Sequence, residues 1–176
     1  MTVILGIDPG SRKTGFGIIR LVSGRSTYVT SGVIRLPVEA ELATRLGVLF
    51  ASLNELIDEY QPTELSIEQV FMAHNAGSAL KLGQARGAAM VACVQRDMAV
   101  HEYSARQIKQ AVVGTGGADK QQVQHMVTRL LQLPATPAED AADALAAALC
   151  HIHTRSTLLR TTATRTAGRR LREGRR

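Results

Sequence analysis

The sequence has few aromatic residues, few cysteines and no long apolar run. Its 176 residues include three Phe, three Tyr, no Trp and two Cys, and no Cys-x-x-Cys motif occurs. Cys93 and Cys150 stand far apart in apolar helical contexts, which predicts buried free thiols in a reducing compartment. No stretch approaches the roughly 18 apolar residues of a membrane span, and the early apolar run Val3–Ile7 ends in Asp8, unlike a signal peptide. We therefore expect a cytoplasmic protein with no membrane partner.

Several common site motifs are also missing. The glycine-rich loop at residues 114–117 is not followed by the Gly-Lys-Ser/Thr of a P-loop, and no Gly-x-Gly-x-x-Gly opens a helix after a strand. The five histidines do not form a metal set by spacing, because His151 and His153 are two apart on one helix and face different ways. An actin-like ATPase could use Asp8-Pro9-Gly10, but the chain lacks a second phosphate loop and the length for two such domains.

Charge is distributed unevenly along the chain. The net charge is +6, yet residues 155–176 hold eight Arg and one Glu, which leaves the remainder close to neutral. A neutral body with clustered acids needs a basic surface elsewhere, a pattern typical of enzymes that bind nucleic acid. The alternative is a neutral enzyme with a solubilising tail. Because the apolar periodicity stops after His153, we predict a folded domain over residues 1–154 and a basic, disordered tail over residues 155–176.

Hydrophobic periodicity predicts an α/β domain. Strands are expected at residues 2–8, 15–22, 26–36, 65–68 and 98–102, and helices at 40–60, 76–96, 104–112, 119–132 and from 136 onward. This order fits a mixed five-stranded sheet flanked by helices, with the strands that end in Asp8 and Glu68 side by side. Thr136 can cap the last helix with Glu139 as its capping-box partner, so Glu139 is given a structural role.

One predicted helix carries a ridge of small residues. Ala79, Gly83 and Gly87 are four residues apart and permit close approach of another backbone. The ridge could pack on the sheet of its own chain, or it could pack on a second helix in a dimer interface. The sequence leaves these two interpretations open.

Four acidic residues carry most of the functional information: Asp8, Glu68, Asp140 and Asp143. Each alone has an ordinary explanation, such as turn chemistry at Asp8 or complementing a helix dipole at Asp140 and Asp143. Together they can converge from two strand ends and one helix turn, where they would repel one another unless cations lay between them. Hard oxygen ligands suit magnesium or manganese, and the chemistry of such a site is two-metal phosphoryl transfer or hydrolysis.

Other residues are candidates for contacts with nucleic acid. Phe71 could stack on an unpaired base or could be a core aromatic residue. Lys109 and Lys120 flank the glycine-rich loop and could contact phosphates, although exposed lysines are common. Lys81 and Arg86 are weaker backbone-contact candidates, and His74 is a better phosphate contact than metal ligand.

The motifs together resemble one family. They lie at residues 6–10, 67–71, 78–87, 106–110 and 140–145, within a similarity that spans about residues 2–150. The chain is similar to the RuvC family, bacterial Holliday-junction resolvases with a ribonuclease-H-like fold. The resemblance implies a homodimer that cuts two strands of like polarity across a four-way DNA junction and works beside the RuvA–RuvB branch-migration machinery.

The resemblance also assigns roles to residues. Asp8, Glu68, Asp140 and Asp143 match the family's catalytic carboxylates, Phe71 an aromatic that opens the junction centre, and Lys109 and Lys120 basic residues near the scissile phosphate. His74 stands where relatives often carry Lys, and Asp140 where some carry His.

The expected mechanism uses two magnesium ions per subunit about 4 Å apart, with manganese able to substitute. The product would be a nick with 5′-phosphate and 3′-hydroxyl ends. Two rival functions remain open: a ribonuclease-H-like nuclease acting on RNA–DNA hybrids, and a structure-specific DNA-binding protein that does not cut.

Overall fold

A computed structural model describes residues 1–69 and 75–173, with side chains described as far as Leu158. The strands are β1 (Thr2–Asp8), β2 (Lys13–Val22), β3 (Arg25–Arg35), β4 (Glu64–Glu68) and β5 (Ala99–Tyr103). The helices are α1 (Leu42–Tyr60), α2 (Ala76–Val94), α3 (Ala105–Val113), α4 (Lys120–Leu130) and α5 (Glu139–Glu173). Within the described residues, none of these helices has the length and apolar character needed to cross a membrane.

The five strands form one mixed sheet in the order β3-β2-β1-β4-β5. Strand β1 is central, antiparallel to β2 and parallel to β4. Every residue from Val3 to Ile7 is buried, as expected for a strand covered on both faces. The parallel pairing of β1 with β4 confirms the prediction that the strands ending in Asp8 and Glu68 are neighbours.

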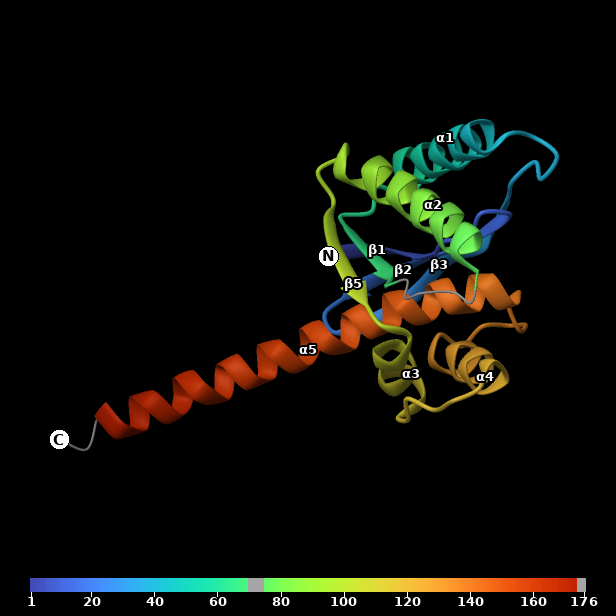
Figure 1. Cartoon of the computed structure of the whole chain (residues 1–176). Coiled ribbons are helices and arrows are strands. Elements are labelled where there is room, and N and C mark those ends of the chain that lie inside the picture. The colour runs from blue at the N-terminus through green and yellow to red at the C-terminus, as the bar shows by residue number, and fades with distance from the viewer. Residues whose placement is uncertain (70–74, 174–176) are drawn as a thin grey trace.

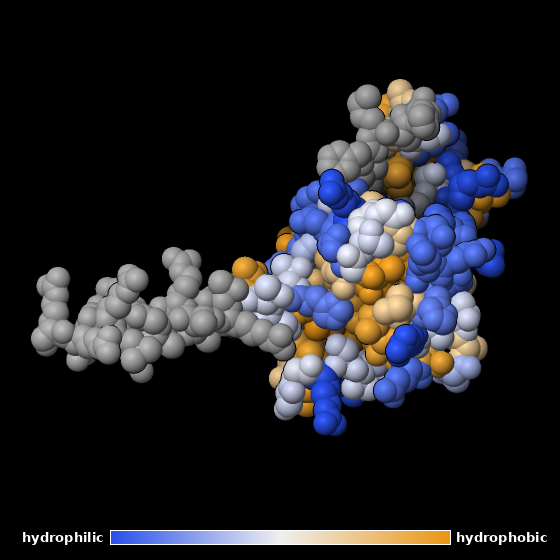
Figure 2. All heavy atoms as spheres, turned by 90° about the horizontal axis from the view of Figure 1, so that it is seen from below, coloured by the Kyte–Doolittle hydropathy of each residue, from blue (hydrophilic) through white to orange (hydrophobic). Residues whose placement is uncertain are grey.

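Helices cover both faces of the sheet (Figure 1). One face packs against α1 and α2, where Leu5 and Ile7 of β1 share a core with Leu49 and Leu53 of α1. The other face packs against α5, which is flanked by α3 and α4, and Ile4 there shares a second core with the α5 side chains. Figure 2 shows this second side of the molecule, where apolar surface gathers in the middle and hydrophilic side chains surround it.

Helix α5 lies unusually close to the sheet because glycine and alanine meet at the contact. A Cβ atom added to Gly6 would lie 1.9 Å from the carbonyl oxygen of Ala144, and one added to Gly15 would lie 1.9 Å from that of Asp140. Ser66 of β4 donates a hydrogen bond of 2.6 Å to the carbonyl oxygen of Ala147. These contacts fix the first turns of α5 against β1, β2 and β4.

The bounds of α5 differ from the prediction at both ends. The helix begins at Glu139 rather than near Thr136, and the Glu139 carboxylate pairs with Lys120 of α4. At the other end the helix continues to Glu173 instead of stopping near His153. Apolar periodicity indicates which residues are buried. A helix segment that extends beyond the core has no such periodicity and cannot be predicted from it. The role of residues 155–176 as a separate tail stays a prediction.

Candidate active site

A cavity of about 320 Å³ opens where β1 and β4 end. Its lining includes three of the four predicted carboxylates, Asp8, Glu68 and Asp143, and both predicted lysines, Lys109 and Lys120. Ala105, Ile108 and Val123 complete the lining. The structure therefore brings these five sequence-predicted residues to one place, although each comes from a different element.

The strand register explains how two of the carboxylates meet. Asp8 and Glu68 are the last residues of the parallel strands β1 and β4, so their side chains lie at the same edge of the sheet. Alternation along β4 places Glu68 on the face of Ser66, which contacts α5. Asp143 lies in the first turns of α5, one residue before Ala144, whose carbonyl oxygen is closest to Gly6.

Burial and mutual repulsion raise the pKa values of these carboxyl groups. Burial, followed by the charges of Asp143, Glu68 and Asp140, raises the pKa of Asp8 to about 7 against the opposing charge of Lys120. Burial is also the main cause of the raised pKa of Glu68 and of Asp143. A bound cation would offset the desolvation and mutual repulsion that raise these pKa values. The available donor atoms are carboxylate oxygens, which are hard ligands.

Three of the four carboxylates line the cavity, and the four do not form a tight cluster. No three of Asp8, Glu68, Asp140 and Asp143 bring ligand oxygens all within 4.8 Å of each other. Asp140 does not line the cavity, and its Oδ2 lies 2.5 Å from Nζ of Lys13 at the start of β2. The residues present thus fit the implied divalent metal in donor chemistry and leave room between the donors.

Both lysines are positioned by capped helices. Ser104 and Gln107 form a capping box at the start of α3, which carries Lys109. Asp119 and Gln122 form another at the start of α4, which begins with Lys120. The Glu139 carboxylate is the main cause of the raised pKa of Lys120, so Lys120 keeps its positive charge beside the cavity.

The weaker DNA-contact candidates have different surroundings. Arg86 of α2 donates through Nε to the carbonyl oxygen of Glu68 at 3.0 Å and pairs with the Glu102 carboxylate, so it holds the end of β4. Lys81 is exposed on α2. Phe71 and His74 lie outside the described residues.

The small-residue ridge of α2 does not pack on the sheet. A Cβ atom added to Gly83 or Gly87 would meet no atom within 4 Å, so the ridge is open and the sheet-packing interpretation is wrong for these residues. Leu80, Val91 and Val94 are 68%, 51% and 56% exposed and recur at helical spacing with the two glycines. We call these five residues the α2 stripe.

A second polar cluster was missed by sequence reasoning. Ligand atoms of Glu64, His101 and His151 all lie within 4.8 Å of one another, so two of the five histidines come together with a carboxylate that chain spacing did not indicate. The spacing argument considered neighbours along one helix, whereas the structure joins residues from β4, β5 and α5. The alternation of β4, which puts Glu64 on the same face as Ser66 and Glu68, was the available signal.

Comparisons with known proteins agree with this geometry. The family model described as crossover junction endodeoxyribonuclease RuvC matches residues 4–151. The protein of that name from Saccharophagus degradans is 62% identical over 160 residues, which cover 91% of this chain and 92% of the relative. The one from Teredinibacter turnerae is 59% identical over 179 residues, covering 99% of both chains.

Solved structures give the same result. The structure of Thermus thermophilus RuvC in complex with Holliday junction substrate superposes with a TM-score of 0.82 at 30% identity, covering 88% of this chain and 95% of the other. The yeast mitochondrial Holliday junction resolvase has a TM-score of 0.65 at 10% identity, over 89% of this chain and 82% of that one, and shows a shared fold. The predicted ribonuclease-H-like α/β fold is confirmed.

Proposed function

The chain belongs to the RuvC family of crossover junction endodeoxyribonucleases, and from that premise we propose that it resolves Holliday junctions at the carboxylate cavity. The single observation that carries this assignment to named residues is the convergence of Asp8, Glu68 and Asp143 with Lys109 and Lys120 in one cavity. Paired symmetric nicks would then complete DNA recombination and repair.

We propose that Asp8, Glu68 and Asp143, with Asp140 beside them, hold two magnesium ions per subunit and accept manganese. When bound, the ions supply Lewis-acid stabilisation of the phosphate and a lowered pKa for an attacking water, giving 5′-phosphate and 3′-hydroxyl ends. The raised carboxyl pKa values support this, because bound cations would relieve the repulsion that raises them.

The basic residues of the cavity act on the DNA strand. Lys109 and Lys120 place ammonium groups where a phosphodiester would lie, and their charges offset the charge that develops at phosphorus. Lys13 forms an ion pair with Asp140 and partly neutralises that carboxylate. Its ammonium group could instead bind a neighbouring DNA phosphate. Arg86 keeps the end of β4, and with it Glu68, in place.

The proposed homodimer is supported by the α2 stripe. Exposed apolar residues and two open glycines on one helix face are suited to packing against the same face of a second copy, in an isologous interface. Val91→Glu should therefore shift the protein to monomer in sedimentation equilibrium. Val38→Glu, a change at another exposed valine, should not.

Several further expectations stay predictions. Stacking by Phe71, phosphate contact by His74 and Lys81, and cooperation with the RuvA–RuvB complex rest on the family resemblance. A cytoplasmic location is supported by the two free cysteines, Cys93 and Cys150, both buried. The division into a nuclease domain over residues 1–154 and a basic tail over residues 155–176 also stays a prediction, and Arg155 at its boundary pairs with Glu64 of β4.

The decisive test is cleavage of a synthetic mobile four-way junction, with magnesium and with EDTA, beside linear duplex and an RNA–DNA hybrid. We expect paired, symmetric, magnesium-dependent nicks on the junction alone, and Asp8→Asn should bind the junction without cutting it. Cleavage of the hybrid would favour the rival nuclease. Binding without cutting, with manganese also tried, would favour a DNA-binding protein.

A further inference from the structure

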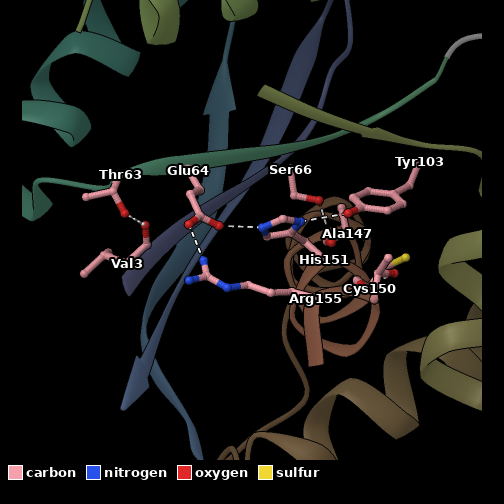
Figure 3. A network of polar contacts seen from close by, with 10 residues as sticks. Val3, Thr63, Glu64, Ser66, Tyr103, Ala147, Cys150, His151 and Arg155 are labelled. Atoms are coloured by element: carbon pink, nitrogen blue, oxygen red, sulfur yellow. Dashed lines mark hydrogen bonds and ion pairs between the residues drawn. The ribbon is translucent and has the colours of Figure 1, made fainter. Parts of the chain in front are cut away.

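Glu64, His101 and His151 lie together beside β4, whose first residue is Glu64 and whose last residue, Glu68, lines the carboxylate cavity. Figure 3 shows Glu64 and His151 directed toward one another. Nε2 of His151 lies 2.5 Å from Oε2 of Glu64. The rings of His101 and His151 stack with centroids 4.1 Å apart and an interplanar angle of 24°. One carboxylate oxygen and one ring nitrogen from each histidine, carried by three different elements, therefore lie within 4.8 Å of one another.

The outer atoms of this cluster are held by other residues. The Tyr103 hydroxyl lies 2.7 Å from Nδ1 of His151, and the Arg155 guanidinium pairs with Oε1 of Glu64. Figure 3 shows both contacts around the Glu64–His151 pair. Metal-binding histidines and carboxylates commonly have such partners on the atom that does not face the metal. These partners fix the histidine tautomer and the direction of the lone pairs.

His101 supplies an imidazole with no competing bond. Its ring nitrogens have no hydrogen-bond partner among residues 1–69 and 75–158, whose side chains are described, and its side chain is half-buried on the edge strand β5. Burial and the neighbouring His151 both lower the pKa of His101. Neutral imidazole is the form that binds metal.

We propose that Glu64, His101 and His151 form a binding site for a divalent transition-metal ion, with zinc as the best match. Two imidazoles and one carboxylate suit zinc, which takes three such protein ligands and leaves a fourth position for water. Magnesium prefers an all-oxygen shell, so the catalytic ions and this ion would not compete for one site. His151 is eight residues beyond Asp143, about 12 Å along the helix.

Zinc at this site would tie β4, β5 and α5 together and stabilise the fold. Binding replaces the hydrogen bond between His151 Nε2 and Glu64 Oε2 by one bond from each atom to the ion. The single ring proton of neutral His151 then resides on Nδ1, which donates to the Tyr103 hydroxyl. The Arg155 guanidinium keeps Oε1 of Glu64, and its positive charge weakens the affinity. Arg155 is thus the residue whose removal should tighten binding.

The test is titration of zinc into the full-length protein with magnesium in large excess to occupy the carboxylate cavity. Wild type and His125→Gln, which changes an exposed histidine on α4, should each bind one zinc ion tightly per chain and melt at a higher temperature with zinc. His101→Gln should weaken that binding by on the order of 100-fold, and Arg155→Gln should strengthen it severalfold.

Equal zinc binding by wild type and His101→Gln would overturn the site. So would zinc binding that disappears in Asp8→Asn, because the ion would then lie in the carboxylate cavity. Arg155→Gln keeps all three ligands, so unchanged or weaker binding by this folded variant would count against the proposal even if His101→Gln folded poorly.

Discussion

Asp8 is the residue on which burial and like charge act most strongly. Its pKa is raised from 3.8 to about 7 in the folded chain, so folding favours the protonated carboxyl group. The resulting stabilisation is complete below pH 4 and is lost as the pH rises through 7. Above pH 7 the metal-free protein therefore carries a cost on the order of 2 to 4 kcal/mol from this residue.

Asp8→Asn should remove that cost. At pH 8 in EDTA, we expect its melting temperature to exceed that of wild type by roughly 5 to 10 °C, and the gap should close at pH 4. Differential scanning calorimetry at the two pH values would measure this. Glu55→Gln, a change at an exposed carboxylate on α1, should show no such pH-dependent gain. A destabilised Asp8→Asn protein at pH 8 would contradict the electrostatic account.

Lys120 is a positive neighbour of all three half-buried carboxylates of the cavity. Its charge lowers the pKa values of Asp8, Glu68 and Asp143, and it lines the same cavity. Lys120→Met should reduce single-turnover junction cleavage by roughly 100-fold, the scale for losing one group that stabilises developing charge. Arg129→Gln, at an exposed position on the same helix, should cut within a fewfold of wild type. Equal rates for the two variants would remove Lys120 from the site.

At the scale of elements, the contact between β1 and α5 depends on the absence of side chains. Gly6→Ala would place a Cβ atom 1.9 Å from the Ala144 carbonyl oxygen, so α5 must move. We expect a loss of about 1 to 3 kcal/mol in the free energy of unfolding and a lower cleavage rate, because Asp143 would move with the helix. Urea unfolding and junction cleavage would measure the two effects.

Gly47→Ala is the matched control for this change. Its added Cβ atom would meet no atom within 4 Å, and α1 is far from the carboxylates in the sequence. Alanine is the better helix former, so stability should rise by about 0.5 to 1 kcal/mol with cleavage unchanged. A Gly6→Ala protein as stable as wild type would show that α5 is not held by this contact.

Elements were predictable from the sequence where burial is periodic. The strands ending in Asp8 and Glu68 were located because both are apolar runs that stop at an acid, and their pairing followed from sheet topology. The path of α5 beyond His153 was missed because it leaves the core. The helix begins at Glu139, three residues after the predicted start, and the Glu139 side chain pairs with Lys120. The Glu64–His101–His151 cluster was missed because strand register, which joins β4 to β5, cannot be read from spacing.

At the scale of the whole molecule, the separation of charge governs DNA affinity. Residues 159–176 contain seven Arg and one Glu, while the cavity concentrates acids in the body. Each phosphate contact by a cation contributes close to one unit to the slope of log affinity against log salt concentration. Deleting residues 159–176 should therefore lower that slope by up to about six units if all seven arginines engage DNA.

Junction binding at several salt concentrations would measure the slope. Replacing the same seven arginines by lysine should preserve it, since the charge is retained. Cleavage at low salt should persist in the deleted protein, because the cavity residues all precede the deletion. An unchanged slope would mean that the segment does not contact the junction.

The order of elements along the chain has a consequence for synthesis. The carboxylates of β1 and β4 emerge from the ribosome early, but Asp140 and Asp143 and the cover of one sheet face arrive together in α5, after every other described element. A nascent or prematurely terminated chain that lacks α5 leaves Ile4 and Ile19 without their packing partners and leaves half of the acidic set missing. From the catalytic roles proposed for Asp140 and Asp143, we therefore expect that a chain terminated before α5 does not cut the junction.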